Sequence, residues 1–283
     1  MTIDNELKSL IILMEDPDPV VKNAVVRRMV ERGEESIQVA ERELSYRSRE
    51  SSQYVESVLN EVKWEFTYKR LEELFKAPQP KLDESLFWIT KLVDPLVDYT
   101  IFSNGLEKLV EEVVGELTDQ KSAVEKVNIY NYLFFKKFKF HHNDIGIENI
   151  EYALIDRSLL SRGGNPVMIT IIYLLIAQKS GIPLYPLCFL GGFVPVYLNP
   201  KGEILFYLNI FREGLIFGED TLRQFFTDLQ LTYNPKSFSL EQERALVSIY
   251  MEMLYYILTI EELNSKGERI KRAMGLLGSK RYL

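Results

Sequence analysis

Four residues that open an apolar segment, Gly163-Gly164-Asn165-Pro166, are the part of the sequence best placed for chemistry. A helix that starts after a tight, glycine-rich turn can lower a thiol pKa or hold an anion at its positive end. Pro166 has neither a nucleophilic side chain nor an N–H group. The glycines lack the longer pattern and the lysine of a phosphate-binding loop, so we expect them to allow close approach of the backbone where a sheet crosses. The stretch predicts the surroundings of an active site without its nucleophile.

Few other residues have the reactivity that catalysis needs. Cys188 is the only cysteine, which excludes an intramolecular disulfide and the usual cysteine-based zinc site. It lies in an apolar, strand-like run, where a free cysteine is most often a small buried hydrophobe. The only histidines are the neighbours His141 and His142, and neighbouring side chains point apart on either a helix or a strand. We therefore expect no close histidine pair acting on one target.

Two further polar patterns have a structural interpretation. Glu148, Glu151 and Asp156 precede the apolar segment, but their spacing fits no metal signature and indicates a solvated helix face. Residues 134–142 interleave basic and aromatic side chains, which is one pattern of single-stranded nucleic-acid binding. The same pattern suits a helix end whose lysines complement the helix dipole. Because the formal net charge is −7, we favour the helix end over nucleic-acid binding. We also expect no metal or other cofactor.

The spacing of apolar residues predicts an α+β fold that is mostly helical, with a small antiparallel sheet packed on a central helix. The central helix begins at Pro166 and its nearly continuous apolar run should be buried. Asn199–Gly202 should form a hairpin turn between two strands. The predicted strands are Leu184–Leu190, Phe193–Leu198 and Ile204–Asn209. Other predicted helices are Glu84–Tyr99, Gly105–Leu117, Ala123–Phe138 and Leu240–Ile260.

The start of the chain resembles a HEAT or armadillo helical repeat. In those repeats the turn reads Asp-x-x-Val-Arg-x-Ala-Ala; here Asp18, Val21 and Ala24 match it. Lys22 takes the place of the arginine and Val25 that of the last alanine. About one such unit is visible, which is too little to bury its own apolar face. We therefore expect a HEAT-like helical cap that docks on the rest of the chain.

A stretch with two prolines among polar residues, Lys76–Asp83, is the best candidate boundary. It predicts a helical segment at residues 1–79 and a second domain at residues 80–283.

Several elements of the second domain together resemble the SirB N-terminal-domain proteins, a bacterial branch of the transglutaminase-like superfamily. In that branch the core helix starts with Arg-x-Gly-x-Pro, a strand carries Pro-Gly-His-Phe, and a later strand carries Asp-Pro-Phe before glycines. The matching residues here are Arg162, Gly164, Pro166, Thr170 and Tyr173, then Leu190-Gly191-Gly192-Phe193, then Asn209-Ile210-Phe211 with Gly214. The likeness covers roughly residues 84–260.

Enzymes of the wider transglutaminase-like superfamily use a Cys-His-Asp triad at the start of the core helix and on two strands, and the SirB branch tends to lack the cysteine. The positions that align with this triad are Pro166, Gly192 and Asn209, so the nucleophile and general base are absent and the acid has become an amide. If the register at the helix start shifts by one residue, the nucleophile position falls on Val167. The other candidates for the same groove are Arg162, Asn165, Phe193 and Cys188.

These observations favour a non-catalytic transglutaminase-like protein, a pseudoenzyme that binds a protein or peptide through the degenerate groove and the helical cap. One alternative is an amidase, peptidase or transglutaminase that uses Cys188 as nucleophile; another is a scaffold or regulatory protein that uses only the helical face. The acidic balance argues against nucleic acid and anionic membranes as partners. We expect a cytoplasmic protein, because no apolar run reaches the roughly 20 residues of a membrane span.

Overall fold

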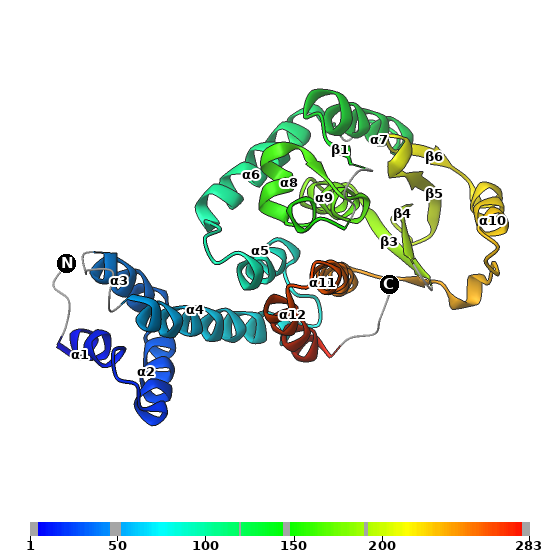
Figure 1. Ribbon diagram of the computed structural model, residues 1–283. Helices are drawn as coiled ribbons and strands as arrows, with labels where there is room; N and C mark the ends of the chain where they lie inside the picture. Colours follow the sequence, from blue (N-terminus) through cyan, green and yellow to red (C-terminus); the bar gives the residue numbers. More distant parts are fainter. Residues whose placement is uncertain (1–4, 46–51, 119, 144–147, 190–191, 279–283) are drawn as a thin grey trace. The chain divides into compact units, whose positions relative to one another are not determined.

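The computed structural model describes residues 5–45, 52–118, 120–143, 148–189 and 192–278 (Figure 1). The chain divides into two compact units, Met1–Glu73 and Leu74–Leu283. No helix in the described part of the chain is long and apolar enough to cross a membrane.

The first unit is built from helices. They are α1 (Asn5–Leu13), α2 (Pro19–Arg32), α3 (Glu34–Ser45) and most of α4 (Ser52–Phe75). The Asp18 carboxylate accepts a hydrogen bond from the Val20 N–H, and Pro19 occupies the first turn of α2, so the sequence fixes where this helix begins. Gly33 ends the helix at a φ of 84°, a conformation that favours glycine.

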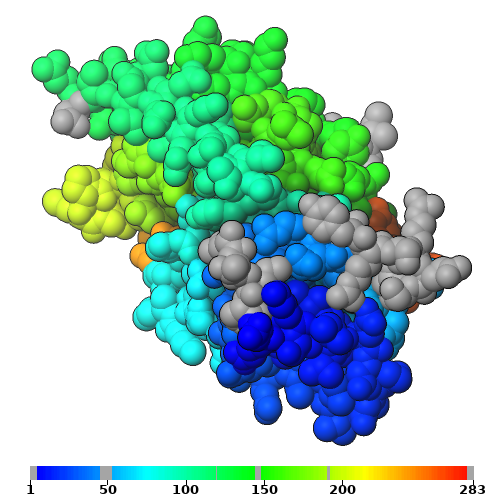
Figure 2. All heavy atoms as spheres, turned by 90° about the vertical axis from the view of Figure 1, so that its left-hand side faces the viewer, coloured from blue at the N-terminus to red at the C-terminus, as the bar shows by residue number. Residues whose placement is uncertain are grey.

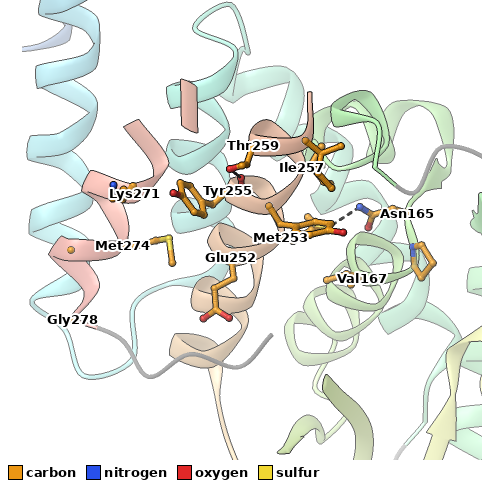
Figure 3. Close-up of a pocket in the computed structure, with 14 residues that line it drawn as sticks. Asn165, Val167, Glu252, Met253, Tyr255, Ile257, Thr259, Lys271, Met274 and Gly278 are labelled. Carbon is orange, nitrogen blue, oxygen red and sulfur yellow. Dashed lines mark hydrogen bonds between the residues drawn. The ribbon is translucent and has the colours of Figure 1, made fainter. Parts of the chain in front are cut away.

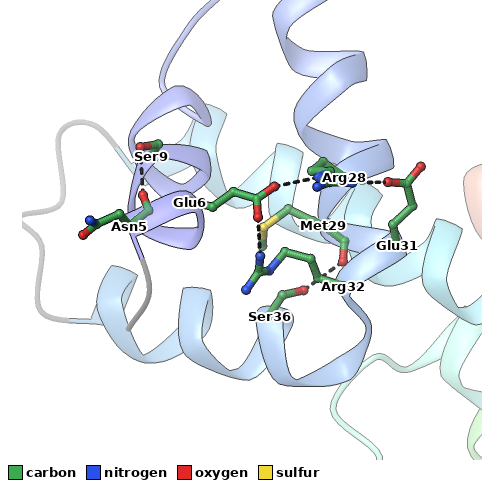
Figure 4. Close-up of polar contacts among 8 residues, drawn as sticks. All are labelled: Asn5, Glu6, Ser9, Arg28, Met29, Glu31, Arg32 and Ser36. Atoms are coloured by element: carbon green, nitrogen blue, oxygen red, sulfur yellow. Dashed lines mark hydrogen bonds and ion pairs between the residues drawn. The ribbon is translucent and has the colours of Figure 1, made fainter. Parts of the chain in front are cut away.

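A shared core and a set of surface ion pairs hold these helices together. Met14 and Met29 are fully buried within one apolar cluster of the unit. Glu6 of α1 receives bonds from Arg28 Nε (2.7 Å) and Arg32 Nη1 (2.6 Å) of α2 (Figure 4). Figure 2 shows the atoms of α1 and α2, in dark blue, lying against each other without a gap. The exposed ion pairs add little stability, so the apolar core dominates.

The second unit combines helices with one five-stranded sheet and a short parallel strand pair. Its α-helices are α5 (Leu82–Val93), α6 (Tyr99–Glu116), α7 (Ala123–Asn131), α8 (Ile155–Ser161), α9 (Pro166–Lys179), α10 (Glu219–Asp228), α11 (Glu243–Ile260) and α12 (Asn264–Leu277). Short 3₁₀ or π turns occur at η2 (Tyr132–Lys137), η3 (Ile150–Tyr152), η4 (Ile210–Arg212) and η5 (Pro235–Ser237). Its strands are β1 (His141–His142), β2 (Gly163–Gly164), β3 (Leu184–Phe189), β4 (Gly192–Leu198), β5 (Ile204–Asn209), β6 (Leu215–Phe217) and β7 (Ser239–Leu240).

Helix α9 forms the centre of this unit, as its apolar sequence predicts (Figure 1). Every residue from Met168 to Ala177 is buried. The Tyr173 main-chain carbonyl accepts a hydrogen bond from Tyr130 Oη (2.6 Å), which ties α7 to the middle of α9. The α+β prediction, mostly helical with a small antiparallel sheet on a central helix, is therefore confirmed.

The five-stranded sheet lies between α9 and α10 (Figure 1), in the order β6-β5-β4-β3-β7. All its pairings are antiparallel. Leu187, Val196 and Tyr207 form one face and pack with Leu222 and Phe226 of α10. Since side chains alternate along a strand, the neighbours of these residues point to the opposite face, toward α9. The predicted hairpin turn is present at Asn199–Gly202, where Gly202 has a φ of 80°.

Several predicted boundaries were wrong. The helix expected over Glu84–Tyr99 ends at Val93, and α6 begins at Tyr99 because the Asp98 carboxylate caps its first turn through the Ile101 N–H (2.9 Å). Helix α11 begins at Glu243 rather than Leu240, and the preceding residues form β7. Leu190, the last residue of one predicted strand, lies outside the described residues.

Candidate functional site

The start of α9 is fixed by Asn165, which is 2% exposed. Its Oδ1 accepts a hydrogen bond from the Met168 N–H (2.8 Å), and its Nδ2 donates to Met253 Sδ of α11 (3.2 Å). Its backbone N–H donates to the Tyr152 carbonyl (2.7 Å). Pro166 follows in the first turn, where the missing N–H costs nothing. The helix start is therefore a rigid position held from two other elements, η3 and α11.

The glycine pair before Asn165 forms β2, which pairs in parallel with the two histidines of β1. A Cβ atom at Gly163 would lie 3.0 Å from His141 Nε2, and one at Gly164 would lie 2.8 Å from Ser158 Oγ. The predicted need for close approach is confirmed, but the prediction of a crossing sheet was wrong, because a histidine ring and a serine hydroxyl fill the space. The His142 ring instead contacts Phe211 (centroids 5.6 Å apart). As expected, the two imidazoles have different neighbours.

The strand positions predicted to match the lost triad lie on the face of the sheet that points away from α9. By alternation from Val196 and Tyr207, Gly192 and Asn209 belong to the face that packs on α10. A Cβ atom at Gly192 would lie 3.2 Å from the Phe189 ring. Asn209 Oδ1 accepts a hydrogen bond from the Arg212 N–H (3.2 Å), so its side chain caps a turn. The alignment of these residues with the triad stays a prediction.

Cys188 lies on the opposite face of the sheet and is 1% exposed. Burial raises the pKa of its thiol to about 12, and the nearby carboxylates Glu241 and Glu252 act in the same direction. The thiolate, which is the nucleophilic form, is therefore disfavoured at neutral pH. The prediction of a small buried hydrophobe is confirmed for this residue.

The two remaining groove candidates hold structural positions. Arg162 ends α8 with a φ of 64°, and its guanidinium lies over the Phe140 ring (5.0 Å). Burial lowers the pKa of this guanidinium. Phe193 is half-buried in β4, where it pairs with Cys188 across the strands.

A cavity of about 980 Å³ opens beside the start of α9, and α11 and α12 form its other walls (Figure 3). We call it the α9–α11–α12 cavity. Its walls are mainly apolar or aromatic: Asn165, Pro166 and Val167 from α9; Glu252, Met253, Tyr255, Tyr256, Ile257, Thr259 and Ile260 from α11; Lys271, Met274 and Gly275 from α12, with Gly278 just beyond its end. Of the sequence-predicted site residues it contains Asn165 and Pro166, together with Val167, the alternative nucleophile position.

Among the described residues, two charged side chains line this cavity. Glu252 is 7% exposed and accepts a hydrogen bond from Ser248 Oγ (3.0 Å). In Figure 3 its side chain extends from α11 into the space between α12 and α9. Lys271, by contrast, is an exposed residue whose Nζ lies 3.2 Å from Glu268 Oε1. A buried carboxylate among apolar walls can bind a cationic or hydrogen-bond-donating group.

Sequence reasoning predicted α9 and α11 but missed Glu252 as a site residue and the cavity that these helices form with α12. A signal was present, because Glu252 is the one charged residue inside the apolar run 245–260. A charge at that place in a buried helix indicates either a partner or a site. For metal binding, the described ranges bring no three His, Cys, Asp or Glu side chains together in a group that could hold an ion.

A central helix packed against an antiparallel sheet forms the core of the second unit. A family model for the transglutaminase-like superfamily matches residues 101–248, which is just over half of the chain, so the chain belongs to this superfamily. Comparisons with curated proteins and with solved structures gave no match. The match covers α9 and the sheet but stops within α11, so most of the cavity wall formed by α11 and α12 lies beyond it.

Proposed function

We propose that this protein is a non-catalytic member of the transglutaminase-like superfamily, and that it binds a protein or peptide beside the start of α9. The observation that carries the proposal is the position of Pro166: it aligns with the helix start where enzymes of the superfamily carry a cysteine, and it lines a cavity of about 980 Å³. Proline supplies apolar surface at that wall but no nucleophile.

The absence of turnover follows from the chemistry of the remaining groups. Cys188 is buried, and its raised thiol pKa keeps it protonated. Members of a catalytic triad act as a unit, and loss of one usually lowers the rate by several orders of magnitude. We infer that replacement at all three positions leaves this helix start without acyl-transfer activity.

The size of the cavity is sufficient for a segment of a peptide. Pockets for small molecules span roughly 300–1,000 Å³, so this cavity is at the upper end and has room for several side chains. Met253 and Met274 line it, and methionine adapts its shape to varied apolar partners. This surface takes the place of the groove expected around Gly192 and Asn209.

The first unit supplies a second candidate surface in this proposal. Apolar side chains on α1 and α2 are exposed, with Ile12 at 61% and Val20 at 75%. We propose that this helical segment is HEAT-like and contributes to partner binding, and that the chain belongs to the SirB branch of the superfamily.

Selection of random displayed peptides tests the binding proposal. Peptides selected on the wild-type protein are then measured against two matched variants, Gly275→Phe and Gly115→Phe. Both glycines lie near a helix end with open space around the missing side chain, but only Gly275 lines the cavity. The proposal expects Gly275→Phe to weaken the selected peptides and Gly115→Phe to leave them unchanged. Selected peptides that bind both variants equally would place recognition elsewhere.

Amide turnover tests the non-catalytic part. Wild-type protein and a Cys188→Ala variant are assayed for ammonia release from glutamine-containing peptides and for peptide hydrolysis, and we expect none. Turnover that Cys188→Ala abolishes would establish the enzyme alternative. Turnover that survives in Cys188→Ala would mean that another group catalyses the reaction.

A further inference from the structure

The α9–α11–α12 cavity places one buried carboxylate among apolar and aromatic walls. We propose that it binds a basic side chain, an ammonium or guanidinium group, carried on an apolar peptide segment, with Glu252 as the counter-ion. This inference rests on the proposed function, because it names the chemistry of the peptide that the same cavity would take.

The walls match both halves of such a side chain. Lysine and arginine carry a long apolar stem below a charged head, so they need apolar surface and one acidic partner. Val167, Met253 and Met274 supply the apolar surface, and Glu252 supplies the acid. Tyr255 and Tyr256 lie on the same wall as Glu252, and the faces of aromatic rings attract cations.

Burial makes Glu252 the stronger of the two charges that line the cavity. It is 7% exposed, so its field is weakly screened by water. Lys271 has 59% of its side-chain surface exposed, so water screens its charge strongly. The cavity therefore favours a cationic over an anionic ligand.

Helix α12 and the residue after it leave room for the ligand, because two positions of this wall are glycines. Gly275 and Gly278 line the cavity, and nothing lies within 4 Å of a Cβ atom at either one. Glycine is a poor helix former, so Gly275 near the end of α12 weakens the helix without any packing gain of its own. A phenylalanine at that position would project into the open space.

Three peptides that differ in one side chain test the inference. They are acetyl-Leu-Lys-Tyr-Leu-amide and its analogues with norleucine or glutamate in place of lysine, titrated into the full chain by calorimetry. Norleucine keeps most of the lysine stem and removes the charge. We expect the lysine peptide to bind at least about tenfold more tightly than the norleucine peptide, the difference that one charge-assisted hydrogen bond makes, and the glutamate peptide to bind weakest.

Two variants, each with a matched control, identify the counter-ion and the binding site. Glu252→Gln keeps the shape and the acceptor for Ser248; it should lower the affinity for the lysine peptide about tenfold or more and leave that for the norleucine peptide unchanged. The control Glu107→Gln makes an equal charge change on the exposed face of α6 and should leave the affinity for both peptides unchanged. Gly275→Phe should lower the affinity for both peptides, and its control Gly115→Phe should leave both affinities unchanged.

The inference is overturned if norleucine binds as tightly as lysine, or if Glu252→Gln weakens both peptides equally. It is also overturned if the lysine peptide does not bind the wild-type protein at millimolar concentration. In each of these cases the proposed function stands as long as displayed peptides are selected and Gly275→Phe weakens them. It fails only when that selection yields no such peptide.

Discussion

The two sides of α9 differ in how completely they are filled. Toward the sheet, Cys188 and Leu208 are buried, and so are the helix residues from Met168 to Ala177. Toward α11 and α12, Pro166 and Val167 are half-buried and border an open cavity. One helix start therefore meets a packed core on one side and an accessible site on the other.

The proposed binding site therefore lies mostly outside the part of the chain that shows the family. The superfamily match covers the helix and the sheet, where the reactive groups are expected, and that side is packed core. The open side depends on α11 and α12, which lie mostly beyond the match. Burial of apolar surface stabilises the first region, and incomplete burial leaves the second able to bind.

The largest effect expected on the sheet side is the protection of Cys188 from alkylation. Because burial raises its thiol pKa to about 12, the thiolate fraction at neutral pH should be roughly a thousandfold below that of an unperturbed cysteine. Iodoacetamide should label the denatured protein quickly and the native protein at a rate set by unfolding. Rapid native labelling near neutral pH would show that the sheet side is open as well.

Shortening one side chain on each side of α9 compares how much the core and the cavity wall contribute to stability. Ile172 is fully buried, so Ile172→Ala should lower the free energy of unfolding by roughly 2–5 kcal/mol. Val167→Ala shortens a side chain at the cavity wall and should cost about 1 kcal/mol or less. Denaturant titration of both variants measures the difference, and equal losses would contradict the distinction between the two sides.

A smaller effect on the free energy of unfolding is expected from a substitution at Gly214, which lies against the Asn131 side chain. Asn131 donates to the Gly214 carbonyl (2.8 Å) and accepts from Tyr173 Oη of α9 (2.6 Å). Gly214 has a φ of 74°, and a Cβ atom there would overlap the Asn131 side chain. Gly214→Ala should cost about 1–3 kcal/mol.

Gly202→Ala serves as its control, because Gly202 also has a positive φ but nothing lies within 4 Å of its Cβ position. The control measures backbone strain alone, and the excess loss in Gly214→Ala measures the contact with Asn131. If both variants lose the same stability by denaturant titration, this contact does not anchor α9.

The smallest effect concerns Asp156 in α8, whose pKa is raised chiefly by burial. Its Oδ1 has no hydrogen-bond partner among the described residues. The folded state holds this proton more tightly than the unfolded state, so the stabilisation is present below the unfolded pKa and is lost as pH rises through the folded pKa. Asp156→Asn should raise the melting temperature at about pH 8 relative to wild type, with a smaller difference at about pH 4. An equal difference at both pH values would contradict the burial of this carboxyl.

Sequence reasoning predicted the central helix and its sheet because their signals are local. Asn165 and Pro166 mark the helix start, a continuous apolar run marks its burial, and Asn199–Gly202 marks the hairpin. The short edge strands β6 and β7 were missed, because segments of two or three residues carry no periodicity of their own.

The candidate site depended on information that the local sequence lacks. The face on which Gly192 and Asn209 lie follows from strand register, and one residue of shift reverses it. The cavity depends on how α11 and α12 pack beside α9, which their amphipathic patterns do not specify. Glu252 was the available clue, since an isolated carboxylate inside an apolar helix requires an explanation.

Methyl NMR of labelled methionines tests most directly whether the start of α9 is a binding site. Met253 and Met274 line the cavity, whereas Met14 and Met29 are buried in the core of the first unit. On titration with the lysine peptide, we expect the methyl signals of Met253 and Met274 to shift in a saturable way and those of Met14 and Met29 to stay in place. Saturable binding that leaves Met253 and Met274 unchanged would contradict the central claim.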